Sequence, residues 1–233
     1  MIGVAIPSRG RPAELKRAMD SLIGRSTEKI HIAVRMDFDD PELRNPLLAG
    51  ICRMDDKAIV SCKVGNRMRG YVDNHVFIDE AAKILSTDCD LMMQFVDDAE
   101  MRTDRWNEKY REAIGDRQIF VCSANVTTPD GSNYPWSFPL IPRRLYEING
   151  GFCLGSNPSV DRCWAAFARA YSCEVRSGVD VIHHHIGAIG AGDKTSQEGR
   201  TPFARNIPDR VAWETEHDRI GREFAEKVRA ACA

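Results

Sequence analysis

Short apolar runs alternate with longer amphipathic segments through the first half of the chain. Four of these runs have the length and apolar content of buried strands, and they occupy residues 2–6, 30–36, 58–64 and 91–96. After the first, third and fourth runs, apolar residues recur every three to four positions, which predicts three helices. The first begins at Pro12, the second has Leu85 at the end of its apolar face, and the third is ended by Gly115. Repeated strand–helix units predict a parallel sheet with helices on both of its faces.

The second half of the chain is less regular. We expect strands at residues 119–123 and 179–183, and helices at residues 143–148, 159–171 and from about Pro208 onward. Residues 127–142 and 187–206 are rich in Gly, Pro and polar side chains, which predicts a long loop or hairpin for the first and a mobile loop for the second. Because no internal repeat or clear domain boundary appears, we expect a single α/β domain.

Three acids, Asp97, Asp98 and Glu100, directly follow the fourth expected strand. Carboxylates at the point where a strand leaves the core are costly unless something neutralises them. A divalent cation would do so, because hard ions prefer oxygen ligands and because ligands bind at the carboxyl ends of strands in open α/β sheets. The other interpretation is a solvated acidic turn before a helix, with Asp104 as the N-cap.

Polar residues also follow the other three expected strands. The first strand is followed by Ser8, Arg9 and Arg11, the second by Asp37, Asp39 and Asp40, and the third by Arg67, Arg69 and Gly70. In a parallel sheet these sets lie along one edge. Carboxylates suit a metal and arginines suit phosphate oxygens, so the combination favours a metal-bound diphosphate. The sequence has neither a G-x-x-x-x-G-K-[ST] loop nor a G-x-G-x-x-G turn, which weakens ATPase and dinucleotide-dehydrogenase interpretations.

The composition of the chain indicates where the protein would be found in the cell more clearly than which reaction it would catalyse. The 233 residues are 28% charged with a formal net charge of -2, so no global basic field attracts nucleic acid or anionic membranes. The eight cysteines include no C-x-x-C pair, and free thiols in a reducing cytosol are the simplest interpretation, which predicts a cytoplasmic protein. The first apolar run is too short for a signal peptide, and no run has the length of a transmembrane helix.

Four stretches together carry a family resemblance. They are residues 4–11 (VAIPSRGR), 66–74 (NRMRGYVDN), 95–106 (FVDDAEMRTDRW) and 181–185 (VIHHH). In their order and spacing they resemble nucleotide-sugar glycosyltransferases with the GT-A fold, specifically the family 2 type and its short phage and bacterial members. The resemblance covers about residues 1–195 and implies a Rossmann-like, mainly parallel central sheet flanked by helices.

The resemblance also implies roles for the residues at the strand ends. The nucleotide would be bound by Pro7, Ser8, Arg9 and Arg11, with Asp37 or Asp39 at the base, and with Arg67, Arg69 and Gly70 near the phosphates or in solvent. Asp97 would lie near the ribose or the sugar, and Asp98 would hold Mn²⁺ or Mg²⁺ through the diphosphate. Ala99 departs from a strict Asp-x-Asp motif, so Glu100 is either a further oxygen ligand or a solvated side chain.

Two other sites each have two interpretations. His183 and His185 share a face of the last expected strand, and one of them would complete the metal site of Asp98, or the histidines are simply a polar strand end. Asp161 opens the 159–171 helix and is either a stabiliser of the helix N-terminus or a general base for an acceptor hydroxyl. Inverting members of the resembled family place an acid on this helix.

Aromatic residues in the 127–142 segment are candidates for contact with the acceptor. Trp136, together with Tyr134 and Phe138, would form a platform for a sugar or base, or a small core beneath the loop. Lys194 would close over the diphosphate or lie exposed.

We therefore predict an enzyme, a metal-dependent glycosyltransferase that moves a sugar from a nucleotide diphosphate donor, a UDP-sugar by preference, to an acceptor hydroxyl with inversion. Residues 1–115 would form the nucleotide-binding half, residues 116–206 the acceptor and metal half, and residues 207–233 a C-terminal helix. The alternatives are a nucleotidyltransferase of similar fold and a non-catalytic nucleotide-sugar or carbohydrate-binding module. The acceptor stays open among a glycan, a lipid-linked sugar, a protein side chain and a hydroxylated DNA base.

Overall fold

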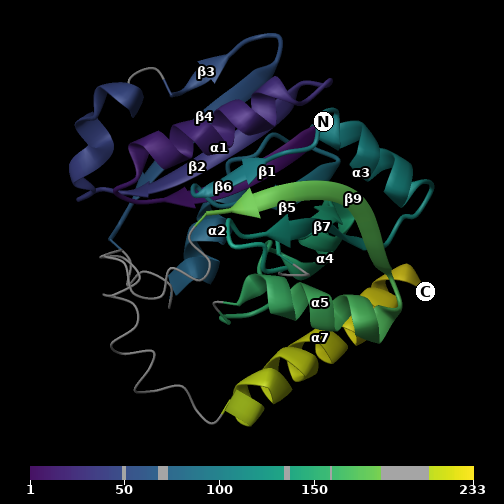
Figure 1. Cartoon of the computed structure of the whole chain (residues 1–233). Coiled ribbons are helices and arrows are strands. Elements are labelled where there is room, and N and C mark those ends of the chain that lie inside the picture. Colours follow the sequence, from purple (N-terminus) through teal and green to yellow (C-terminus); the bar gives the residue numbers. More distant parts are fainter. Residues whose placement is uncertain (49–50, 68–72, 134–136, 158, 185–209) are drawn as a thin grey trace.

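A single mixed β-sheet organises the chain (Figure 1). The computed structural model describes residues 1–48, 51–67, 73–133, 137–157, 159–184 and 210–233. Within these ranges the sheet has nine strands in the order β3-β4-β2-β1-β5-β8-β7-β9-β6. The strands are β1 (Ile2–Ser8), β2 (Ile30–Asp37), β3 (Arg53–Met54), β4 (Ala58–Gly65), β5 (Leu91–Gln94), β6 (Ala99–Met101), β7 (Val121–Thr127), β8 (Leu140–Pro142) and β9 (Glu174–His183).

Helices cover both faces of this sheet, as the sequence predicts. They are α1 (Pro12–Gly24), α2 (Asn74–Ala82), α3 (Trp106–Ile114), α4 (Arg143–Asn149), α5 (Val160–Tyr171) and α7 (Arg210–Cys232), with short 3-10 turns at Pro41–Arg44 and Pro46–Leu48. The apolar faces of α1 and α3 form one core with the sheet, and α2, α4 and α5 form the second core on the opposite face.

The four strands expected in the first half pair as predicted. β1 runs parallel to β2 and to β5, and β2 runs parallel to β4. The carboxyl ends of these strands therefore lie along one edge of the sheet.

The rest of the sheet differs from a purely parallel arrangement. β3, β6 and β8 pair antiparallel to their neighbours. β6 follows the Asp97–Asp98 pair, for which the sequence predicts a metal site or an acidic turn, and β8 lies in residues 127–142, for which it predicts a long loop or hairpin. Neither was predicted as a separate strand, because strands of three residues are too short to show a periodic pattern.

β9 begins at Glu174, five residues earlier than predicted, and has an irregularity near its middle. It pairs parallel to β7, but Ser123 aligns with Arg176 and Asn125 with Asp180, so β9 has two more residues than β7 over this stretch. Gly178 lies in the extra stretch with a φ of +67°, a conformation that residues with a Cβ rarely adopt.

The C-terminal helix α7 lies along α5, as Figure 1 shows at the bottom of the molecule. Phe224 packs edge-on against Trp164 with ring centroids 5.7 Å apart. The backbones approach closely at Gly221, where a Cβ would lie 2.5 Å from the backbone nitrogen of Phe167. The helix thus completes the second core rather than standing apart from the domain.

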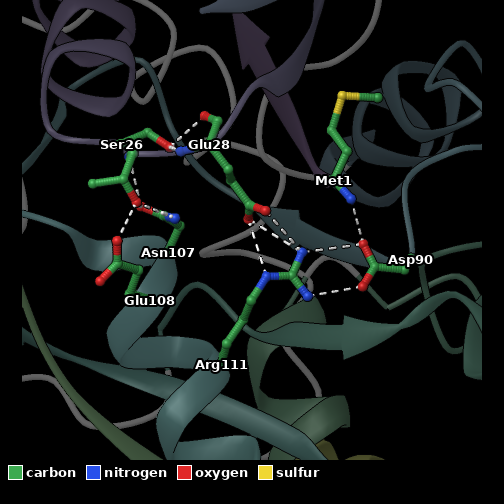
Figure 2. Close-up of polar contacts among 8 residues, drawn as sticks. Met1, Ser26, Glu28, Asp90, Asn107, Glu108 and Arg111 are labelled. Carbon is green, nitrogen blue, oxygen red and sulfur yellow. Dashed lines mark hydrogen bonds and ion pairs between the residues drawn. The ribbon is translucent and has the colours of Figure 1, made fainter.

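Ion pairs fasten the opposite, amino-terminal edge of the sheet (Figure 2). Asp90, just before β5, accepts from the Met1 amino group at 2.6 Å and from Arg111 of α3 at 2.9 Å. Arg111 also contacts Glu28, which precedes β2. Burial tends to raise the pKa of Asp90, but Arg111 and the amino group outweigh it and lower that pKa to about 2.

The cysteines and the helix lengths complete the description of the fold. All eight cysteines are free thiols, and five of them are buried. Among the described residues, no helix is long and apolar enough to span a membrane.

Candidate functional site

Two adjacent acids and one arginine form the centre of the candidate site. Asp97 and Asp98 follow β5, and Arg11 lies in the loop between β1 and α1, which the pairing of β1 with β5 brings beside them. Arg11 Nη1 donates to Asp98 Oδ2 at 2.7 Å, and Nη2 lies 2.9 Å from Asp97 Oδ1. Ser8 Oγ, at the end of β1, donates to Asp97 Oδ2 at 2.8 Å. Four residues that the sequence places at the ends of two strands, β1 and β5, therefore lie in contact with one another.

Asp97 is almost completely buried, with 1% of its surface exposed. Burial raises the pKa of its carboxyl above the ordinary value, Arg11 lowers it by less, and the adjacent charge of Asp98 adds to the rise. The pair is thus a concentrated acidic site, and Arg11 is the cation that partly neutralises it.

Strand pairing brings His183 to Asp98 from the far end of the sheet. β6 and β9 pair with Ala99 opposite His183, which places the imidazole Nε2 2.9 Å from Asp98 Oδ1. The backbone nitrogen of His184 donates to the Asp98 carbonyl at 3.0 Å. His184 also lies 3.4 Å from Glu100 through its Nε2, so Glu100 faces His184 and not the Asp97–Asp98 pair.

The donor types at Asp98 fit a divalent cation. A carboxylate and an imidazole are ligands that Mn²⁺ accepts, and His183 Nδ1 is a buried nitrogen without a hydrogen-bond partner. Among the described residues, however, no group of three or more His, Cys, Asp or Glu side chains is arranged to hold a metal ion. Asp98 and His183 would be two of the ligands of such a cation, and His185 lies outside the described residues.

A second cluster forms at the ends of β2 and β4. Arg9 Nη1 bridges Asp37 Oδ2 at 2.8 Å and Asp39 Oδ1 at 2.7 Å, and Arg67 reaches Asp39 Oδ2 at 3.1 Å. The pKa of Asp39 is lowered, chiefly by its hydrogen bond from Arg9. Asp37 is fully buried, whereas the Asp39 side chain is 28% exposed, so of the two acids Asp39 is the one that a ligand can reach.

Arg35, which sequence reasoning missed, supports this second cluster from below. Its side chain is fully buried, contacts Asp37 and the Asn66 carbonyl, and donates to Glu80 at 2.8 Å. The guanidinium lies over the Phe77 ring, 4.4 Å from its centroid. The available signal was a lone charge within the apolar run 30–36, since a buried charge requires partners.

Asp161 lies in the first turn of α5 with its side chain half-buried. Its Oδ1 accepts from the backbone nitrogen of Arg162 at 2.9 Å, as a residue that stabilises a helix N-terminus does. Burial raises the pKa of the Asp161 carboxyl, and the electrostatic influence of nearby His183 is among the weaker opposing effects. Both interpretations of Asp161 therefore remain predictions.

Of the remaining residues predicted for the site, the structure describes Pro7 and Phe138 and does not describe the others. Pro7 is half-buried near the end of β1. Phe138 is 3% exposed and packs on Phe95 and His183, so of the two interpretations of the aromatic residues the structure supports a core position for this ring. The predictions for Arg69, Gly70, Tyr134, Trp136, His185 and Lys194 fall outside the described residues.

Comparison with known proteins identifies the fold. No family model and no curated protein matches the sequence. S. aureus TarS residues 1–349 in complex with UDP-GlcNAc superposes with a TM-score of 0.60 at 12% identity, covering 97% of this chain and 72% of that one. The mannosyltransferase PcManGT from Pyrobaculum calidifontis, in complex with GDP-Man and Mn²⁺, gives 0.60 at 11% identity, covering 99% and 74%.

A third solved structure is similar at a lower score. Glucosyl-3-phosphoglycerate synthase from Mycobacterium tuberculosis, in complex with Mn²⁺, UDP and phosphoglyceric acid, gives a TM-score of 0.52 at 15% identity, covering 90% of this chain and 80% of that one. At such identities the likeness shows the fold alone. The chain has a GT-A-like α/β fold in a single domain, which confirms the fold predicted from sequence.

Proposed function

We propose that this chain is a metal-dependent glycosyltransferase that moves a sugar from a nucleoside diphosphate donor, with a UDP-sugar as the expected donor, to an acceptor hydroxyl. One observation carries the proposal: arginines and acids gather at the carboxyl ends of β1, β2, β4 and β5. Arg11 contacts Asp97 and Asp98 there, while Arg9 and Arg67 contact Asp39. Guanidinium groups match phosphate oxygens, and carboxylates match both a base and a cation.

The comparisons support this choice among the functions that the fold can host. TarS was solved with UDP-GlcNAc, and PcManGT with GDP-Man and Mn²⁺. UDP-GlcNAc and GDP-Man are both nucleoside diphosphate sugars. A donor of the same chemical class would lie across the edge of the sheet that the two clusters occupy.

Each cluster would have a distinct role in binding the donor, and all residues of the two clusters except His183 belong to the nucleotide-binding half, residues 1–115. Asp39 would accept a hydrogen bond from the base, while Arg9 and Arg67 hold its carboxylate in place. The guanidinium of Arg11 would bind the diphosphate. Asp98 and His183 would hold Mn²⁺ or Mg²⁺, which when bound stabilises the leaving diphosphate as a Lewis acid.

The half formed by residues 116–206 would bind the acceptor. Asp161 would take the proton from the acceptor O–H as that oxygen attacks the sugar C1 on the face opposite the diphosphate, which inverts the configuration. A raised carboxyl pKa suits this role, because a general base works best when its pKa approaches the working pH. We assign acceptor contact to Trp136.

The decisive experiment is a ligand panel followed by a turnover assay. UDP, GDP, CDP and the corresponding diphosphate sugars are tested with and without Mn²⁺, and a ligand that binds only the native state raises the melting temperature. The expected result is a Mn²⁺-dependent shift with a uridine diphosphate and slow release of UDP from a UDP-sugar. Release of pyrophosphate from a nucleoside triphosphate and a sugar phosphate would instead identify a nucleotidyltransferase. Binding without any turnover on an acceptor array would identify a binding module.

A further inference from the structure

The carboxylate oxygens that would hold the metal are already engaged by this chain. Asp98 Oδ2 accepts from Arg11, and Asp98 Oδ1 contacts His183. Asp97 Oδ2 accepts from Ser8, and Asp97 Oδ1 lies at ion-pair distance from Arg11. All four oxygens of the acid pair therefore have a protein partner within 3 Å, and Arg11 supplies two of those partners.

A divalent cation and Arg11 would compete for the Asp98 carboxylate in this arrangement. A bound Mn²⁺ or Mg²⁺ would lie about 2.1 Å from a carboxylate oxygen. A metal held between Asp98 and His183 would bind Asp98 Oδ1, while Arg11 Nη1 lies 2.7 Å from Oδ2, so the two cations would bind the two oxygens of one carboxylate. Like charges at such a distance repel strongly where solvent is scarce, and the Asp98 side chain is only 7% exposed.

Arg11 has both the position and the geometry to change partners. It comes from the loop between β1 and α1, and its side chain is 25% exposed, compared with 1% for Asp97. Its planar fork spans two carboxylates now, and the same fork fits two oxygens of a diphosphate. A diphosphate that draws Arg11 outward would leave Asp98 open to a metal.

We infer that Arg11 is an internal counter-cation that keeps the metal position at Asp98 closed until a nucleoside diphosphate takes its guanidinium. The inference rests on the proposed function and deepens it, because it predicts the order of events at that site. Metal alone binds weakly, nucleotide binding promotes metal binding, and by linkage the metal promotes nucleotide binding to the same degree.

The test is Mn²⁺ binding to the full chain without nucleotide, followed by the electron paramagnetic resonance signal of free Mn²⁺. Arg11→Met removes the charged fork and keeps a side chain of similar length. Arg102→Met is the matched control, because Arg102 is a nearby arginine that pairs with Glu100 and not with the Asp97–Asp98 pair. Arg11→Gln serves as a second variant if Arg11→Met fails to fold by circular dichroism.

We expect Arg11→Met to bind Mn²⁺ at least tenfold more tightly than the wild type, and Arg102→Met to stay within twofold of it. Equal, measurable affinity of the wild type and Arg11→Met would overturn the inference while leaving the proposed function standing. An equal gain in Arg102→Met would also overturn it, since the effect would then be general electrostatics. Absence of Mn²⁺ binding in every variant, with or without UDP, would overturn both the inference and the metal-dependent function.

Discussion

Removal of the buried guanidinium of Arg35 offers the sharpest test of how the nucleotide edge is held together. The perturbation is Arg35→Met, which keeps an apolar stem over the Phe77 ring and deletes the charge. Arg35 now pairs with Asp37 and Glu80 and donates to the Asn66 carbonyl. The variant would leave the fully buried Asp37 with Arg9 as its remaining charged partner.

The expected loss follows from the burial of each partner. Breaking a buried ion pair from one side costs about 3–5 kcal/mol, because the remaining charge stays in the core. Glu80 is 23% exposed and solvent screens it, and Arg9 still neutralises part of Asp37, so the lower end applies. We expect a loss of about 3 kcal/mol, a large share of the roughly 5–15 kcal/mol that stabilises a domain.

Urea unfolding followed by circular dichroism measures this loss directly. With a slope of about 1–3 kcal/mol per molar urea, the midpoint should fall by about 1 M or more. Arg17→Met, an exposed arginine on α1, is the control and should stay within about 0.5 kcal/mol of the wild type. Adding Asp37→Asn to Arg35→Met should restore part of the loss. A loss below about 1 kcal/mol would refute the view that this ion cluster supports the edge.

Three further outcomes are expected. Asp161→Asn should lower turnover by roughly 10²–10⁴-fold with little change in donor binding, because Asn keeps the size of the side chain but cannot take the proton of the acceptor hydroxyl. A nearly unchanged kcat with the true acceptor would show that Asp161 only stabilises the helix N-terminus. Gly221→Ala should destabilise the chain by about 1–3 kcal/mol in urea unfolding, because its Cβ would collide with the backbone of Phe167; an unchanged midpoint would contradict the close packing. Since the pKa of folded Asp90 is lowered from 3.8 to about 2, its stabilising effect decreases below about pH 4 and is lost as the pH falls through 2. Asp90 is half exposed, so Asp90→Asn should lose no more than about 1 kcal/mol at pH 7, and in acid titrations of stability the difference should disappear below about pH 2; a constant difference would contradict the ion pair with Arg111.

The sequence predicts elements well where a pattern extends over several residues. β1, β2, β4 and β5 lie where their apolar runs predict strands, and the helices lie where apolar residues recur every three to four positions. β6 was missed and β8 was predicted only as part of a long loop or hairpin, because three residues carry no periodic signal and their pairing partners are distant in sequence. β9 pairs with β6 across about 80 residues, which no local pattern encodes.

The candidate site could be predicted in its composition but not in its contacts. Arg11, Asp97 and Asp98 were each recognised as polar residues at strand ends, because parallel strands bring such ends to one edge. That Arg11 bridges both acids depends on β1 lying next to β5, which follows from the strand order and not from either segment alone. The burial of Asp37 and its pairing with Arg35 likewise require the packed structure.

The irregular middle of β9 determines whether His183 can face Asp98 at all. Side chains alternate along a strand, and Val175, Val179, Val181 and His183 all have odd numbers, so the two extra residues keep the inward series in phase. Whether the number of residues between Val175 and His183 is odd or even therefore decides which face of the sheet the imidazole lies on. Deleting Gly178 alone would turn the imidazole to the opposite face, whereas deleting both extra residues would keep it inward. A deletion or insertion in the irregular part of β9 therefore keeps His183 facing Asp98 only when it changes the strand by an even number of residues.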